Sequence, residues 1–127
     1  MNGWLLAAGA LATVTALIHL FAGGRDVVRP LLESALPSEP MRTLHAVWHF
    51  ATADLLFSGA ALIALGASNT TNAPLVLFIA AHFVAYSAVF LVITLRADWS
   101  RPLLRLPQWI LLLPVAVLAG VGALQMY

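Results

Sequence analysis

Four long runs of apolar residues divide the chain, and short polar segments separate them. The runs cover residues 4–22, 46–66, 74–95 and 109–126. Each is about 18–22 residues long, which is enough helix to cross roughly 30 Å of hydrocarbon. Backbone polar groups find no water partner in lipid, so each run is expected to be helical along its length. The pattern predicts an all-α fold, a transmembrane four-helix bundle that forms a single domain over residues 1–127.

The three connections between the runs carry unequal charge. Residues 23–45 and 96–108 hold all six arginines, whereas residues 67–73 hold no charged side chain. Because cytoplasmic segments of membrane proteins are rich in Lys and Arg, the first and third connections are expected in the cytoplasm and both termini on the outer side. Within the cytoplasmic loop 23–45, Pro30 favours the start of a short interfacial helix, with an irregular loop as the alternative.

Composition points to the same class of protein. Hydrophobic residues make up 62% of the chain and charged residues 9%, and the mean hydropathy is +0.96. Roughly a quarter of the residues of an ordinary soluble domain are charged. The chain has no lysine and a net charge of +1, which argues against nucleic acid as a partner and leaves the lipid bilayer. Cysteine is absent, so no disulfide, thiolate metal site or thiol nucleophile can form.

All four histidines lie within the apolar runs or at their ends, where ionisable side chains are costly. With a rise of about 1.5 Å per residue, His19 and His49 lie about 4–5 Å inside the cytoplasmic boundary and His45 lies at it. His45 and His49 are four residues apart and project from one helix face. His19 reaches the same level from the antiparallel neighbour. Three imidazoles with water are typical of an open zinc, copper or iron site.

Other residues are candidates to complete this transition-metal site. Glu33 and Glu39 of the cytoplasmic loop are carboxylates within the connection above the cluster. His82 lies about 20 Å from the cytoplasmic boundary and joins only if the third helix is displaced or kinked. Position 46, directly after the first histidine of the pair, is Ala46, whereas the zinc-protease pattern has Glu there. The zinc-protease reaction is therefore not indicated, and the pattern leaves open whether the protein is an enzyme.

Haem is an alternative cofactor for the same histidines. A b-type haem needs two imidazoles from facing helices at matching depth, with small residues to leave room for the ring. His19 with His45 or His49 meets the requirement on depth. A two-haem bundle would need histidines about 13–14 residues apart on one helix, and the four-residue spacing does not provide this.

A membrane accessory or transport subunit is the second alternative. Asp54 lies about 12 Å inside the boundary and is rotated by half a turn from His45, so it is not expected to share an ion with the histidine pair. It would instead form a deep polar core with His82, with Tyr86, Ser58 and Ser87 as hydrogen-bond partners. A four-span monomer leaves little room for an aqueous path, so transport would require a homo-oligomer or a larger membrane complex. The histidines would then only cap the bundle.

One further pattern lies in the first half of the chain. It comprises His19, Gly23-Gly24-Arg25, Arg29-Pro30-Leu31-Leu32, Arg42, His45 and Trp48-His49. This pattern resembles an uncharacterised family of small four-span bacterial inner-membrane proteins. The resemblance implies a four-span fold and a multi-pass location in the bacterial inner (plasma) membrane, and it implies no function.

Overall fold

The computed structural model describes residues 1–68 and 72–126, so residues 69–71 of the polar connection 67–73 lie outside the described residues. No strand occurs in the described ranges, and the all-α prediction is confirmed. In chain order the helices are α1 (Gly3–Ile18), η1 (His19–Val28), α2 (Arg29–Leu32), α3 (Ser38–Ala67), α4 (Ala73–Arg96), α5 (Pro102–Arg105) and α6 (Trp109–Leu124).

Three helices are long and apolar enough to cross a membrane. The elements α1, η1 and α2 form one continuous helix, Gly3–Leu32, of 30 residues; α3 also has 30 residues and α4 has 24. Even the 24 residues of α4 extend over about 36 Å, more than the hydrocarbon thickness of about 30 Å. The apolar helix α6 is shorter, with 16 residues, or about 24 Å. These helices indicate a membrane-embedded protein.

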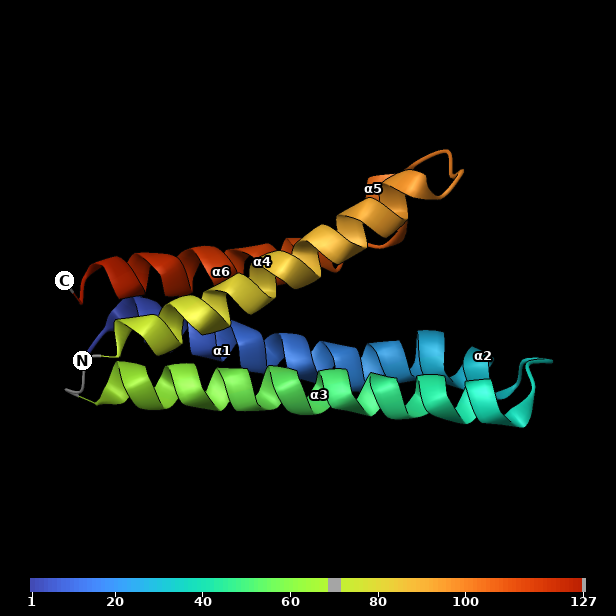
Figure 1. Cartoon of the computed structure of the whole chain (residues 1–127), viewed down its shortest axis with the longest axis horizontal. Helices are drawn as coiled ribbons and strands as arrows, with labels where there is room; N and C mark the ends of the chain where they lie inside the picture. The colour runs from blue at the N-terminus through green and yellow to red at the C-terminus, as the bar shows by residue number, and fades with distance from the viewer. Residues whose placement is uncertain (69–71, 127) are drawn as a thin grey trace.

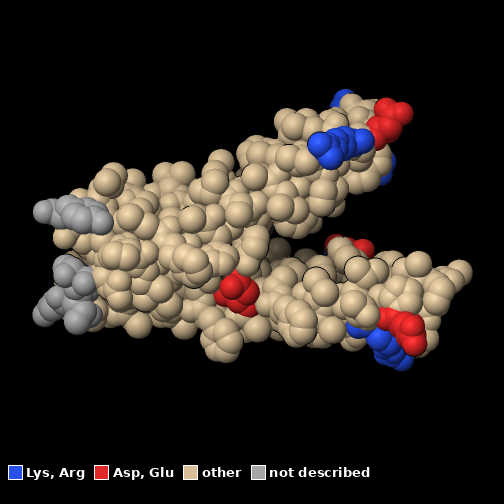
Figure 2. Space-filling view, viewed as in Figure 1, with Lys and Arg blue, Asp and Glu red and all other residues tan. Residues whose placement is uncertain are grey.

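The helices pack as two hairpins. α1 packs along α3, α4 packs along α6, and contacts between α1 and α6 join the hairpins. Both ends of the chain lie at one end of the molecule, where the hairpins meet (Figure 1). Toward the other end, which carries α2 and α5, the hairpins diverge (Figure 1). The space-filling view shows an open cleft between them there, with the basic side chains gathered at the tips of both branches (Figure 2).

Close backbone contact holds the α1–α3 hairpin together. A Cβ atom added at Gly9 would lie 2.8 Å from both the carbonyl oxygen of Gly59 and the backbone nitrogen of Ile63. On α3, a Cβ atom at Gly59 would lie 2.8 Å from the hydroxyl of Thr13. Small residues allow helices to approach this closely, which is how helices associate in lipid, where hydrophobic burial gives no advantage.

Asn2 joins three helices at the end of the molecule where the termini lie. Its side-chain oxygen accepts hydrogen bonds from the N–H groups of Trp4 (3.1 Å) and Leu5 (3.3 Å), and so caps α1. Its side-chain nitrogen donates to the carbonyl oxygen of Gly122 on α6, at 2.9 Å. Its backbone N–H donates to the carbonyl oxygen of Gly66 on α3, at 2.8 Å. The hairpins are therefore tied together where the termini lie.

The first connection differs from the predicted loop over residues 23–45. The first long helix continues through residue 32 and α3 begins at Ser38, so residues 33–37 alone connect them. The predicted interfacial helix is instead the last turn of the first long helix. The first apolar run ends near residue 22, but the helix continues beyond it. A helix that protrudes from the apolar layer exposes glycines and charges to water at little cost. An ion pair with four-residue spacing, Arg29 to Glu33 at 3.0 Å, supports its end.

A π-helical segment allows the first helix to pass Pro30. Proline lacks an N–H group, and its ring crowds the carbonyl of the preceding α-helical turn. η1 is a π-helix, and the N–H of Arg29 donates to the carbonyl oxygen of Gly24, five residues earlier. Pro30 then occupies the first turn of α2, where no donor is required.

Candidate functional site

Two histidines of α3 lie side by side. The Nε2 atoms of His45 and His49 are 3.2 Å apart, and the ring centroids are 4.9 Å apart. The spacing of four residues places both rings on one face of the helix. His45 is half-buried and His49 is exposed. Their nitrogens therefore meet at an accessible position on the surface of α3.

His19 lies against the same part of α3 but contacts a different residue. Its ring stacks on the indole of Trp48, with centroids 3.8 Å apart and planes inclined by 14°. Its Nε2 lies 3.2 Å from the carbonyl oxygen of Trp48 and donates to it. The indole also covers Gly23, where an added Cβ atom would collide with it. Because Gly23 follows His19 by four residues, one face of the first helix receives the whole indole.

The predicted three-histidine cluster is brought together only in part. His45 and His49 meet, whereas His19 is engaged with Trp48 on the neighbouring helix. Within residues 1–68 and 72–126, no three His, Asp or Glu side chains are grouped so that they could hold a metal ion.

The other three candidate ligands lie elsewhere. Glu33 forms its ion pair with Arg29. Glu39 is in the first turn of α3, six residues before His45 and so about 9 Å away along the helix axis. On α4, Nδ1 of His82 lies 3.1 Å from the carbonyl oxygen of Phe78 in its own helix. In the described part of the chain, none of these side chains joins the His45–His49 pair.

A separate polar contact links α3 to α4. The hydroxyl of Tyr86 donates to Oδ2 of Asp54 at 2.9 Å. His82 lies one turn before Tyr86, with ring centroids 5.9 Å apart, and bonds to its own helix rather than to Asp54. The hydroxyl of Ser87 also bonds to its own helix, and no hydrogen bond joins Ser58 to Asp54 among the described residues. Tyr86 is therefore the partner of Asp54.

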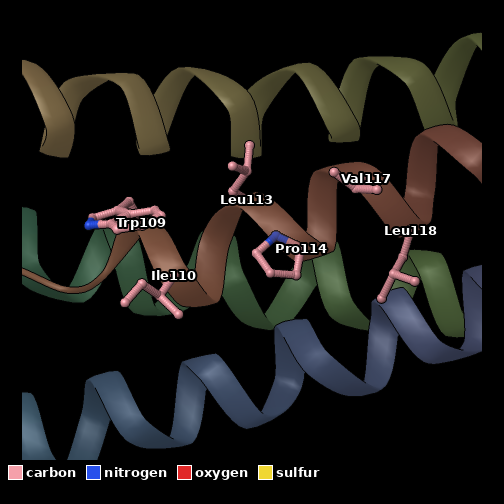
Figure 3. A pocket seen from close by; sticks show the side chains of 6 residues that line it. All are labelled: Trp109, Ile110, Leu113, Pro114, Val117 and Leu118. Carbon is pink, nitrogen blue, oxygen red and sulfur yellow. The ribbon is translucent and has the colours of Figure 1, made fainter.

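An apolar groove of about 570 Å³ runs along one face of α6. Figure 3 shows the side chains that line it, all from this one helix, with α1 and α4 on either side. They are Trp109, Ile110, Leu113, Pro114, Val117 and Leu118. The groove is lined by apolar side chains and offers no carboxylate, imidazole or hydroxyl.

The sequence pattern predicts no role at the site for two of its residues, Trp48 and Gly23. The sequence signal is the four-residue spacing from His19 to Gly23. This spacing indicates a flat face on the first helix that can receive a large ring. Which side chain of α3 packs on this face depends on the rotation of α3 about its axis. Spacing within one helix does not determine that rotation.

Comparison with known proteins adds no family assignment. No family model, no curated protein and no solved structure matches the chain. The residues of the site and the membrane-length apolar helices are therefore the observations that bear on function.

Proposed function

We propose that this protein is a multi-pass membrane protein that binds a transition-metal ion through His45 and His49. The observation that carries the proposal is the Nε2–Nε2 distance of 3.2 Å. Two imidazole nitrogens at about 2.0–2.1 Å from a tetrahedral ion lie about 3.3–3.4 Å from each other. The pair thus already has nearly the separation that chelation needs. Zinc, copper and iron are the ions that imidazole ligands suit.

His19 is the proposed third ligand. With the Nε2 proton donated to the carbonyl of Trp48, Nδ1 of the neutral ring is the nitrogen left to bind an ion. A ligand imidazole held by a backbone carbonyl through its other nitrogen is the usual arrangement around metals. Water would take the remaining position, because His49 is exposed.

Metal content of the purified protein tests the proposal. Elemental analysis is expected to find zinc, copper or iron in a fixed ratio to the chain, and the visible spectrum is expected to lack a Soret band. A Soret band would select haem instead. A protein that holds no metal, even after incubation with zinc and removal of the excess, would support the accessory subunit.

The proposed orientation places the histidine pair toward the cytoplasm. His45 belongs to the first third of α3, toward the end of the molecule where the basic side chains gather (Figure 2). Excess arginine marks the cytoplasmic side. The proposal therefore includes a four-span bundle in a bacterial inner membrane, with α6 as the fourth span and both termini outside.

Cysteine labelling in intact cells is expected to support this orientation. The chain has no cysteine, so single variants report single positions. A membrane-impermeant thiol reagent should label Gln125→Cys from outside and should label Arg101→Cys only after the membrane is opened. The reverse pattern would place the histidine pair on the outer side.

A membrane accessory or transport subunit is the second candidate. The observation that favours it is the hydrogen bond from Tyr86 to Asp54, which joins the two hairpins through a carboxylate. Haem has less support from the geometry, because His19 and Trp48 are in stacking contact where a macrocycle would have to enter.

A further inference from the structure

The two hairpins end differently at the open end of the molecule. In the α1–α3 hairpin, Arg25 is paired with Asp26 at 2.6 Å and Arg29 with Glu33 at 3.0 Å. In the α4–α6 hairpin, no ion pair involves an arginine among the described residues. Residues 23–45 contain three arginines and three carboxylates, whereas residues 96–108 contain three arginines and one carboxylate. The positive charge of the second hairpin is therefore not cancelled locally.

Exposed apolar side chains surround these arginines. Leu103 and Leu104 of the short helix α5 are 41% and 68% exposed, and Trp99 is 39% exposed. The guanidinium of Arg105 lies 5.7 Å from the centre of the Trp99 ring. The indole N–H of Trp109 donates to the carbonyl oxygen of Leu103 at 3.2 Å, which ties α5 to the start of α6. Arginine, tryptophan and leucine together at the end of membrane-length helices are typical of the headgroup region of a bilayer.

We propose that this surface binds the headgroups of anionic phospholipids. It consists of Arg96, Trp99, Arg101, Leu103, Leu104 and Arg105, and is called the α5 surface below. Guanidinium groups donate pairs of hydrogen bonds to phosphate oxygens. Leucine and tryptophan would contact the adjacent acyl chains and carbonyl region. Figure 2 shows basic side chains at the tips of both branches of the molecule. The guanidiniums of Arg25 and Arg29 already have carboxylate partners, so their branch is expected to bind these lipids weakly.

This proposal does not depend on metal binding. It requires only that the long apolar helices lie in a bilayer and that α5 lies at its surface. Basic residues next to a membrane contribute about 1 kcal/mol each toward an anionic leaflet, which is about fivefold in affinity.

Lipid binding by two matched double variants tests the α5 surface. Purified full-length protein in neutral detergent is titrated with phosphatidylglycerol or phosphatidylcholine, and bound lipid is counted by native mass spectrometry. The wild type is expected to prefer phosphatidylglycerol. Arg101→Gln with Arg105→Gln should weaken phosphatidylglycerol binding about 30-fold and leave phosphatidylcholine binding unchanged. Arg25→Gln with Arg29→Gln removes the same charge and should change phosphatidylglycerol binding less than threefold.

Three outcomes would overturn the proposal. The first is a wild type with no preference for phosphatidylglycerol, a measurement that does not depend on how the variants fold. The second is an equal loss in both double variants, which would mean that net charge alone attracts the lipid. The third is unchanged binding in Arg101→Gln with Arg105→Gln, which would place the lipid elsewhere.

Discussion

Replacing Gly9 with Ala is expected to destabilise the protein by about 1–3 kcal/mol, the usual cost of an added methyl group in a packed interface. The new Cβ atom would lie 2.8 Å from two backbone atoms of α3, at Gly59 and Ile63. Backbone atoms of a packed helix cannot turn aside as a side chain can, so the two helices must separate. The higher helix propensity of alanine offsets only about 0.5–1 kcal/mol. Thermal unfolding of the purified protein, followed by circular dichroism, measures the effect.

Gly120→Ala is the matched control for this experiment. Gly120 lies within α6, and apart from its chain neighbours and the helix's own backbone no atom is within 4 Å of the position where its Cβ would be. The same methyl group is expected to leave the melting temperature unchanged or to raise it slightly, because only propensity changes. Equal melting temperatures for the two variants would show that α1 and α3 are not in close backbone contact.

Removing either histidine of the pair is expected to abolish most metal binding. His45→Ala and His49→Ala should each weaken zinc binding by on the order of 100-fold or more. Even the loss of a residue that only hydrogen-bonds to a metal ligand typically lowers metal affinity about 10–100-fold. In the proposed site the two nitrogens, 3.2 Å apart, would hold one ion together, so the double variant should be little worse than either single one. Zinc affinity of the purified variants, measured with a competing chelator, checks this.

Three further variants and a pH series test which side chains bind the metal. His82→Ala and Asp54→Asn should retain metal, because both side chains bond elsewhere. His19→Ala should also reduce affinity, because His19 is the proposed third ligand. Affinity should fall as the pH is lowered through the range in which imidazole gains a proton, because a ligand imidazole must be neutral. Full metal content in both His45→Ala and His49→Ala would contradict the proposed site.

The apolar runs predict a helix's bounds well where the helix ends close to the ends of its run. The third run, 74–95, differs by one residue at each end from α4, Ala73–Arg96. The first two helices are longer than their runs, because hydropathy reports the apolar layer and not the helix. A helix continues into water when ion pairs and local propensity allow it, as at Arg29 and Glu33.

The sequence predicts the contacts of the candidate site that lie within one helix. It does not predict the contacts that depend on how two helices are packed. The meeting of His45 and His49 follows from their spacing alone. The level of His19 follows from helical rise, but its direction depends on how α1 and α3 are rotated against each other. That rotation directs its ring onto Trp48. Likewise Asp54 meets Tyr86 rather than His82, one turn away on the same helix.

The contact of Asn2 with Gly122 has a consequence for the order of assembly. The hydrogen bond joins residues 120 positions apart, whereas the helices of each hairpin are consecutive long helices in the chain. Closing a loop of that length costs more chain entropy than closing a hairpin, so each hairpin can form before the two dock. The side of α1 that faces α6 therefore stays uncovered until α6 has been synthesised and has docked against it.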